Sequence, residues 1–331
     1  MNDGEAGART VQVVSDFAEL PRGGHVVTIG TFDGVHRGHR FLLDHAAMRA
    51  VELGLPLLIV TFEPVPVQVL RPDLFPGRLC SRETKLALLA EGGARVIAVL
   101  PFTHAFSRLT AEEFMTHLVH TARPREVWVG EAFALGRNRD GNVPRLRAIG
   151  TELGYRLEVV SRLADETGVI SSSAIRQLVQ QGQPAEAARK LGRRFRIEGE
   201  VIHGAHVGRT IGFPTANIVP PPSLVALPDG IYATLAKLPG TDRLLASMTY
   251  IGTRPALNTG PRLIETHILD FDGDLYGQRV GVEFVERLRG DATFSGVDEL
   301  VRQLHADEAM TRTVLGAEIA GVRGASEAAV R

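Results

Sequence analysis

The feature that most constrains the fold of this chain is a change of hydrophobic pattern near residue 185. Before that point, short apolar runs alternate with segments that carry apolar residues every three or four positions. The runs have the length and the valine-rich composition of buried parallel strands, and they lie at residues 25–29, 55–62, 94–100, 126–129 and 156–160. The helical segments lie at residues 41–53, 82–91, 111–121 and 143–153. This alternation predicts a doubly wound α/β sheet, whose ligands bind outside the carboxyl ends of the strands.

After residue 185 the chain has the pattern of strands separated by turns rich in glycine, proline and aspartate. The expected strands lie at residues 195–201, 230–238, 244–250, 263–271 and 278–286. Asp272-Gly273 stands between the last two and predicts a hairpin there. An amphipathic helix follows at residues 297–315. We therefore expect one domain at residues 14–184 and a second at residues 185–320, a small β-barrel closed by a C-terminal helix.

Composition excludes several classes of partner. The 331 residues carry a net charge of −1, so the chain lacks the basic field that holds nucleic acid. No run approaches the roughly eighteen apolar residues of a membrane span, and residues 1–13 lack the pattern of a signal peptide. We expect a soluble, cytoplasmic protein with no membrane partner. Cys80 is the single cysteine, which excludes an internal disulfide and a zinc site of several thiolates, and a small hydrophobic side chain is its simplest role.

Lysine is scarce, and this limits how the chain can handle phosphate. It occurs only at positions 85, 190 and 237, and none of these completes a GxxxxGK[ST] loop. Phosphoryl chemistry in this chain must therefore rely on arginine, histidine, backbone amides and metal.

The first phosphate-handling motif is the segment at residues 28–39, which reads TIGTFDGVHRGH. It joins a strand to a helix, so His36 and His39 fall on the turn where a parallel sheet presents its ligand site. Free amides and the positive dipole of the helix favour a phosphate there, and two imidazoles can donate hydrogen bonds to it. The chemistry that fits is nucleotidyl transfer, in which charge develops on the α-phosphate and on the departing pyrophosphate. Polar residues that merely cap a helix are the alternative. The candidate binding residues in this segment are Gly30, Phe32, Asp33 and Gly38.

A second element follows the last strand of the first half. Residues 170–176 read ISSSAIR and open a helix, which places Ser171 and Ser172 at its amino terminus and Arg176 about one turn inside. Hydroxyls and amides can hold a phosphate there while the guanidinium pairs with it through two hydrogen bonds. Serine is also an ordinary helix cap, and that alternative stays open.

The other phosphate-handling motif is the glycine-rich segment GRTIGFPTAN at residues 208–217. Glycines there let the chain fold closely over a nucleotide. The Thr215 hydroxyl and the Asn217 carbonyl oxygen are suitable ligands for a magnesium ion that bridges phosphates. Glu265 lies in an expected strand further on, where it is either a general base for a substrate hydroxyl or a side chain that faces solvent. Two nucleotide motifs on one chain suggest two consecutive reactions. The candidate nucleotide-binding residues in this segment are Gly208, Gly212, Pro214, Thr215 and Asn217.

These motifs, in this order, resemble the bacterial bifunctional riboflavin kinase and FMN adenylyltransferase family, also called FAD synthetase. The resemblance extends over residues 26–307 and includes DFDGDLYG at residues 270–277. It implies a Rossmann-like nucleotidyltransferase domain that converts FMN to FAD and a C-terminal barrel that phosphorylates riboflavin to FMN, with ATP as co-substrate of both. It further implies that Thr215 and Asn217 bind Mg2+ and phosphate and that Glu265 activates the riboflavin hydroxyl. His36, His39 and Arg176 would contact the ATP phosphates of the adenylyl site.

The chain departs from the family pattern mainly in its first half. Val65 replaces the usual histidine after Phe-Glu-Pro, Ala132 replaces an asparagine or aspartate, and Leu135 replaces an aromatic residue. Ala256 and Leu257 replace the usual Thr-Phe in the second half. Riboflavin phosphorylation is thus expected more firmly than FAD formation. The alternatives are a monofunctional riboflavin kinase with a degenerate first domain and a nonenzymatic flavin-binding regulator.

Overall fold

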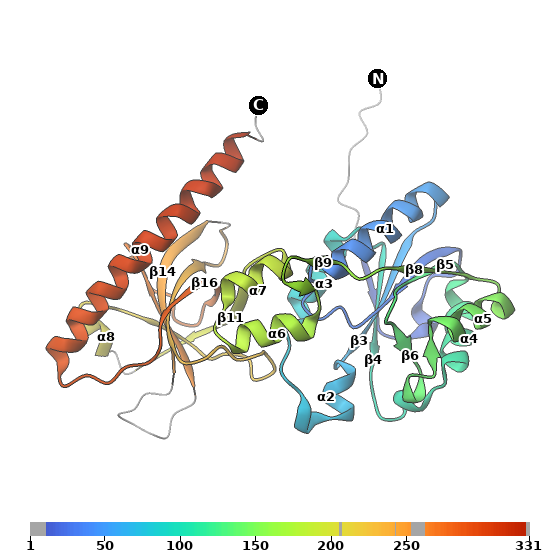
Figure 1. Cartoon of the computed structure of the whole chain (residues 1–331), viewed down its shortest axis with the longest axis horizontal. Coiled ribbons are helices and arrows are strands. Elements are labelled where there is room, and N and C mark those ends of the chain that lie inside the picture. Colours follow the sequence, from blue (N-terminus) through green and yellow to red (C-terminus); the bar gives the residue numbers. More distant parts are fainter. Residues whose placement is uncertain (1–10, 205–206, 242, 253–261, 329–331) are drawn as a thin grey trace. The chain divides into compact units, whose positions relative to one another are not determined.

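The structure, a computed structural model, describes residues 11–204, 207–241, 243–252 and 262–328 (Figure 1). The chain forms two compact units. The first consists of Met1–Pro76 and Ser81–Ser172, and the second of Gly77–Cys80 and Ser173–Arg331. Each unit is described by itself below.

A six-stranded parallel sheet forms the centre of the first unit, as the alternating pattern predicts. Its strand order is β1-β4-β3-β2-β5-β8. The sequence pattern missed only the edge strand β1, because just one of its three residues is buried. The strands are β1 (Gln12–Val14), β2 (His25–Ile29), β3 (Leu57–Glu63), β4 (Val96–Pro101), β5 (Pro124–Gly130) and β8 (Arg156–Val160).

Helices cover both faces of this sheet. Helices α1 (Arg37–Leu53) and α3 (Arg82–Glu91) pack on one face, against alternate strand residues such as Val26 and Ile59. Helices α4 (Ala111–Ala122) and α5 (Val143–Leu153) pack on the other, against the intervening residues. The bounds of α3 and α5 are those predicted, whereas α1 begins four residues earlier than expected, at Arg37.

Short elements complete the first unit. They are the helix α2 (Pro66–Leu70), the strand pairs β6 (Ala134–Leu135) with β7 (Gly141–Asn142) and β9 (Ala164–Asp165) with β10 (Gly168–Val169), and the 3-10 helices at Phe17–Glu19, Pro72–Leu74, Phe106–Arg108 and Arg137–Arg139.

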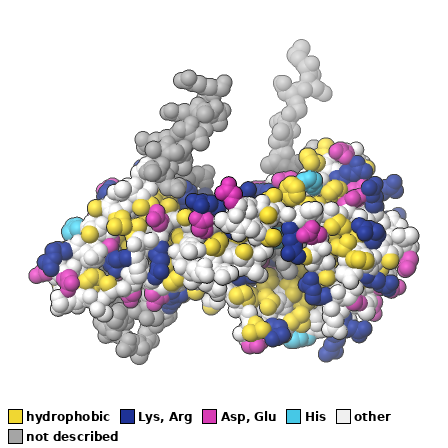
Figure 2. Space-filling model, viewed as in Figure 1, with side chains coloured by type: hydrophobic (Ala, Val, Ile, Leu, Met, Phe, Trp, Pro, Cys, Tyr) yellow, Lys and Arg dark blue, Asp and Glu magenta, His cyan; other side chains and the backbone are white. Residues whose placement is uncertain are grey.

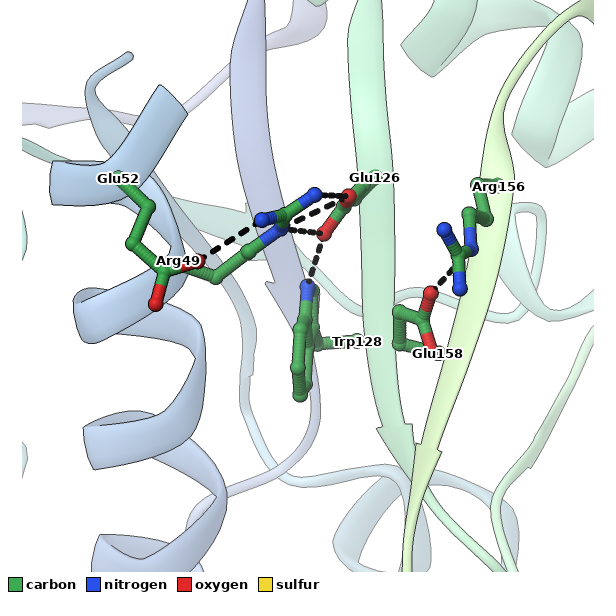
Figure 3. Close-up of polar contacts among 6 residues, drawn as sticks. All are labelled: Arg49, Glu52, Glu126, Trp128, Arg156 and Glu158. Atoms are coloured by element: carbon green, nitrogen blue, oxygen red, sulfur yellow. Dashed lines mark hydrogen bonds and ion pairs between the residues drawn. The ribbon is translucent and has the colours of Figure 1, made fainter. Parts of the chain in front are cut away.

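An ion pair between a partly exposed arginine and a buried glutamate joins α1 to β5 (Figure 3). The Nε and Nη2 atoms of Arg49 donate to Oε1 of Glu126, each at 3.0 Å, and Trp128 Nε1 donates to its Oε2 at 3.1 Å. Glu126 is only 3% exposed. The same face carries Arg156 and Glu158 on β8, opposite Glu126 and Trp128 respectively. Because α1 begins at the predicted phosphate motif, this ion pair also helps to fix the position of that motif.

The second unit is a closed antiparallel barrel of six strands, in the order β11-β12-β15-β14-β13-β16. The barrel confirms the predicted fold class. Strand β12 was not predicted, because two of its three residues lie inside the glycine-rich motif. The strands are β11 (Phe195–Ile202), β12 (Ala216–Ile218), β13 (Gly230–Lys237), β14 (Leu244–Gly252), β15 (Leu263–Ile268) and β16 (Arg279–Arg289), and the short helix α8 (Val207–Thr210) precedes β12.

The predicted hairpin at Asp272-Gly273 was wrong. Strand β15 pairs with β12 and β14, whereas β16 pairs with β11 and β13. A strand in a closed barrel has only two neighbours, and both neighbours of β15 come from elsewhere in the chain. The segment that holds Asp272-Gly273 is therefore a connection between two strands that do not pair.

Helix α9 (Val297–Ala328) packs on the outside of the barrel, and it is longer than the predicted helix at residues 297–315. Its buried Asp307 accepts hydrogen bonds from Arg289 Nη2 at 2.7 Å and from Gln303 Nε2 at 2.8 Å. The unit also contains α6 (Ser172–Gln180), apart from its first residue, and α7 (Pro184–Leu191), which packs on β16.

Basic and acidic side chains are interspersed with neutral and hydrophobic ones on the face that Figure 2 shows. Among the described residues, no helix is both long and apolar enough to cross a membrane.

Candidate active sites

The first site lies where the strand order of the parallel sheet reverses. Strand β2 has β3 on one side and β5 on the other, and the helices that follow β2 and β5 pack on opposite faces. Such a switch point leaves a crevice outside the carboxyl ends of the two strands. A cavity of about 230 Å³ occurs there, and it is lined by residues that follow β2, β5 and β8. It brings together the predicted residues Gly30, Phe32, His36, Gly38 and His39.

The turn that enters this cavity has an unusual backbone. Phe32 and Val35 have φ angles of 49° and 38°, a left-handed conformation that is rare for a bulky or β-branched residue. Phe32 folds its ring over Gly30, where an added Cβ would lie 2.9 Å from the ring. Phe32 is 1% exposed, so packing holds this turn in place. The strained backbone turns the chain sharply from β2 into α1.

His36 caps the helix and also faces the cavity. Its Nδ1 accepts a hydrogen bond from the His39 amide at 3.3 Å, so this nitrogen carries no proton and the ring proton is on Nε2. The two imidazoles are stacked, with centroids 3.6 Å apart. An added Cβ on Gly38 would lie 3.2 Å from the His36 ring, so a larger residue would displace that ring. Helix capping and a place in the site are thus both features of His36.

The residues of the segment 170–176 belong to different units: Ser171 and Ser172 to the first and Arg176 to the second. Ser172 Oγ donates to the carbonyl oxygen of Asp33 at 3.0 Å, which joins the start of α6 to the turn after β2. Ser171 directly precedes α6. Arg176 belongs to the second unit, where its Nε donates to the carbonyl oxygen of Gly77 at 2.8 Å. A contact of Arg176 with phosphate therefore stays a prediction.

The residues that depart from the family pattern lie in different surroundings: at the cavity, at the start of a helix and in the core. Ala132 lines the cavity, and its carbonyl oxygen accepts from Arg139 Nη2 at 3.3 Å. Val65 is 4% exposed and stands at the N-cap of α2 without a side-chain cap. Leu135 belongs to the core between the sheet, α4 and α5. Ala256 and Leu257 lie outside the described residues.

Sequence reasoning missed other residues of the first cavity. Glu131 and Arg162, which form an ion pair at 3.4 Å, follow the carboxyl ends of β5 and β8, and both line the cavity. Their position directly after two predicted strands was the signal that could have found them.

The second site is a cavity of about 460 Å³ in the barrel unit. It is lined by Gly208, Pro214, Thr215 and Asn217 from the glycine-rich motif. This volume is within the usual range for small-molecule sites. The lining also contains Arg209, Thr266, Asp272, Asp274 and Tyr276, to which the sequence reasoning gave no role. Four of these five residues lie within the segments 208–217 and 270–277, which resemble the family. That resemblance was the sequence signal that could have identified them.

Glycines allow this cavity to form around the motif. An added Cβ on Gly208 would lie 2.2 Å from the carbonyl oxygen of Phe213, and one on Gly204 would lie 2.5 Å from Asn217 Nδ2. Gly212 has a φ of 86° in the turn that precedes Pro214. The backbone thus comes close to the polar groups of the motif only because these positions lack side chains.

The pairing register of three strands places Asn217, Glu265 and Tyr250 in one row. Asn217 lies opposite Glu265, and Glu265 lies opposite Tyr250. Asn217 is 4% exposed, and its Nδ2 donates to the carbonyl oxygen of Thr215 at 3.3 Å. Burial, together with the nearby carboxylates of Asp291 and Glu265, raises the pKa of Tyr250 to about 12. Glu265 is half-buried and stands beside the residues that line the cavity.

Comparison with known proteins agrees with this geometry. The family described as FAD synthetase matches residues 19–174, and the family described as riboflavin kinase matches residues 191–315. The bifunctional riboflavin kinase/FMN adenylyltransferase of Escherichia coli K12 is 36% identical over 93% of this chain and 98% of its own length. The protein of the same name from Pseudomonas fluorescens is 35% identical over 88% of this chain and 93% of its own.

A solved structure is similar along almost the whole chain. It belongs to a protein of Streptococcus pneumoniae that is described as a macrolide-efflux protein, and its identity to this chain is 30%. The TM-score is 0.82, over 91% of this chain and 98% of that one. Macrolide efflux is said of the streptococcal protein alone. With two matching family descriptions and curated relatives that align over nearly their full length, this chain belongs to the bifunctional riboflavin kinase/FMN adenylyltransferase family.

Proposed function

We propose that this chain makes FAD from riboflavin in two steps that each consume ATP. In the barrel unit, the 5′-hydroxyl of riboflavin attacks the γ-phosphorus of ATP, and ADP leaves as FMN forms. In the first unit, a phosphate oxygen of FMN attacks the α-phosphorus of a second ATP, and pyrophosphate leaves as FAD forms. Family membership supports both reactions. The observation that carries the kinase assignment is the pairing of Asn217 with Glu265 beside the second cavity.

The nucleotide and the flavin would approach this pair from two sides. The cavity lined by Gly208, Thr215 and Asn217 has the size and polar lining for ATP phosphates. Glu265 stands one strand away, on the outer face of the barrel that also carries Tyr250. We assign to Glu265 the removal of the proton from the 5′-hydroxyl as it attacks.

The donor set of this cavity fits a magnesium ion. A hydroxyl and a carboxamide oxygen are hard ligands, and magnesium in kinase sites is held by few protein ligands together with substrate phosphates. The hydrogen bond from Asn217 Nδ2 to Thr215 directs the nitrogen away from the role of ligand. We therefore assign Thr215 Oγ1 and Asn217 Oδ1 as the metal ligands. When bound, the ion would neutralise charge on the phosphates.

In the adenylyl site, His36 and His39 would donate hydrogen bonds to the ATP phosphates. The Nε2 proton of His36 and the positive end of the α1 dipole are suited to this role. Gly30, Phe32, Asp33 and Gly38 shape the turn, and Ser171 and Ser172 extend the site at the start of α6. A contact of Arg176 with the ATP phosphates stays a prediction. No covalent intermediate is required, because the site acts by positioning and by stabilising the developing charge.

We assign residues 14–184 to the adenylyltransferase and residues 185–320 to the kinase. The use of ATP in both reactions supports a cytoplasmic location.

The test is a time course of riboflavin, FMN and FAD with purified protein, ATP and Mg2+, separated by chromatography. FMN should appear first and FAD should follow. Absence of FMN would contradict the kinase assignment.

A specific observation favours a second candidate function, a kinase that stops at FMN. Ala132 lines the adenylyl cavity with a methyl group where the family usually has a polar side chain. The same time course separates the two candidates, because a monofunctional kinase would accumulate FMN without FAD. A nonenzymatic flavin-binding protein would consume no ATP, and the placement of Glu265 beside Asn217 argues against it.

A further inference from the structure

A chain of four buried hydroxyl groups runs from the kinase cavity into the interior of the barrel. Thr266 Oγ1 lies 3.0 Å from Thr249 Oγ1, which lies 2.7 Å from Thr234 Oγ1, which lies 2.8 Å from Ser247 Oγ. Thr266 is 1% exposed and the other three are 0% exposed. The four residues come from strands β13, β14 and β15, so the barrel register alone brings them together.

The chain of hydroxyls ends on the floor of the kinase cavity. Thr266 lines this cavity beside Val201 and Ile268, which are 2% and 5% exposed. Thr266 is thus a polar residue between two apolar ones in this part of the cavity lining. Thr266 also lies directly opposite Ala216, the residue that separates Thr215 from Asn217 in the sequence.

Only two arrangements of the hydroxyl protons are consistent with these distances. Each hydroxyl has one proton, and the buried Ser247 hydroxyl must donate to Thr234 to be satisfied. In the first arrangement, Thr234 donates to the Ser247 carbonyl oxygen at 3.1 Å, so Thr249 donates to Thr234 and Thr266 donates to Thr249. In the second arrangement, Thr234 donates to Thr249 and Thr249 donates to Thr266. The proton of Thr266 then needs an acceptor outside these four hydroxyls.

The first arrangement satisfies all four protons within the protein. The second depends on water or a ligand to accept the proton of Thr266. The first arrangement is thus the one that needs no group outside the protein. It leaves the Thr266 oxygen able to accept one further hydrogen bond.

We infer that Thr266 is preset as a hydrogen-bond acceptor for the nucleotide of the kinase reaction, with Thr249, Thr234 and Ser247 as the positioning residues that fix its proton. This inference rests on the proposed kinase function. The donor that an ATP complex offers is either the adenine amino group or a water molecule bound to the metal. Both donors would bind in the same way, by a hydrogen bond to a hydroxyl oxygen that already donates its own proton to a neighbouring residue.

The test compares ATP with purine riboside 5′-triphosphate, which lacks the amino group, as substrates for riboflavin phosphorylation. Thr266→Val and Thr234→Val should each raise the KM for the nucleotide by about tenfold, the value of one lost hydrogen bond of about 1.4 kcal/mol. Thr234→Val is the sharper variant, because it leaves Thr266 intact and removes only the group that fixes its proton. Thr249→Ser keeps the hydroxyl and should retain the wild-type KM.

The pattern of loss identifies the donor. If it is the adenine amino group, wild type prefers ATP to the analogue and the valine variants lose that preference. If it is metal-bound water, both nucleotides are affected equally and the Mg2+ concentration for half-maximal rate rises.

Thr311→Val is the matched control, because it removes a buried hydroxyl that donates to the Asp307 carbonyl oxygen outside this chain of hydroxyls. It should lower the melting temperature and leave the KM unchanged. An unchanged KM in Thr234→Val and Thr266→Val, with a lower melting temperature only, would overturn the inference. The proposed function would then still stand on FMN formation by the wild-type protein.

Discussion

Asn217 and Glu265 lie directly opposite each other on the antiparallel strands β12 and β15. Side chains in such pairs point to the same face, with Cβ atoms about 4.5–5.5 Å apart. The pairing therefore places a carboxamide at the edge of the nucleotide cavity beside a carboxylate on the outer face of the barrel. A phosphate donor and a hydroxyl acceptor can meet between them.

Replacement of this carboxylate by Glu265→Gln should lower the rate of FMN formation by at least about a hundredfold, because a general base contributes roughly 10²–10⁴ in rate. Conversion of added FMN to FAD should be unaffected, since that reaction is assigned to the other unit. Glu286→Gln, at an exposed position of β16, is the matched control and should keep wild-type kinase activity. Near-normal FMN formation by Glu265→Gln would remove the base assignment.

A methyl group at position 38 should impair the adenylyl site selectively. In Gly38→Ala the new Cβ would lie 3.2 Å from the His36 ring, so the imidazole has to move. Small displacements of a positioned group cost up to about a hundredfold in rate, and we expect FAD formation to fall at least about tenfold. Riboflavin phosphorylation by the same preparation is the internal control. Equal loss of both activities would indicate misfolding instead.

Restoration of the family residues in the first unit should raise FAD formation. The double variant Val65→His with Ala132→Asn should increase the rate of FAD formation by at least about tenfold. One preorganised hydrogen-bond donor typically changes the rate by a factor of about 10²–10³, and the rate factors of two donors in one site need not multiply. Each single variant should be measured beside the double one, since Val65 is buried and Ala132 lines the cavity. No gain in any of the three would show that these departures do not limit the reaction.

The Arg49–Glu126 ion pair should make the stability of the first unit depend on pH. Burial by itself would raise the pKa of Glu126, but hydrogen bonds from Arg49 and Trp128 hold it below its ordinary value. A folded-state pKa below the unfolded one adds stability that is complete above about pH 4.3 and is lost as the pH falls through the folded value. Glu126→Gln should thus lower the free energy of unfolding by about 2 kcal/mol at pH 7 and by progressively less in acid.

Fluorescence of Trp128, the only tryptophan of the chain, can follow this unfolding because its indole ring donates a hydrogen bond to Glu126 in the folded unit. Glu158→Gln is the matched control on the same face of the sheet (Figure 3). Its partner Arg156 is 72% exposed, and such surface pairs contribute less than about 1 kcal/mol. An equal effect of both variants, or an effect that does not depend on pH, would contradict the role of the Arg49–Glu126 pair.

The sequence predicted element types well where local periodicity is strong. The helices at Arg82–Glu91 and Val143–Leu153 have the predicted bounds, because burial on one face repeats every three to four residues. It also placed His36 and Gly38 on one turn, since neighbours in sequence must be neighbours in space. It did not find β12, whose three residues are too few to show a period.

By itself, then, the sequence determined the two kinds of architecture, the strand-to-helix turn with its histidines and the glycine-rich motif. The tertiary structure decided which strands pair, and so it corrected the Asp272-Gly273 hairpin, set Asn217 opposite Glu265 and aligned Thr234 with Thr249 and Thr266. The physical reason is that a hydrophobic pattern records which face of a segment is buried. The register between distant strands depends instead on barrel closure, which requires all six strands at once.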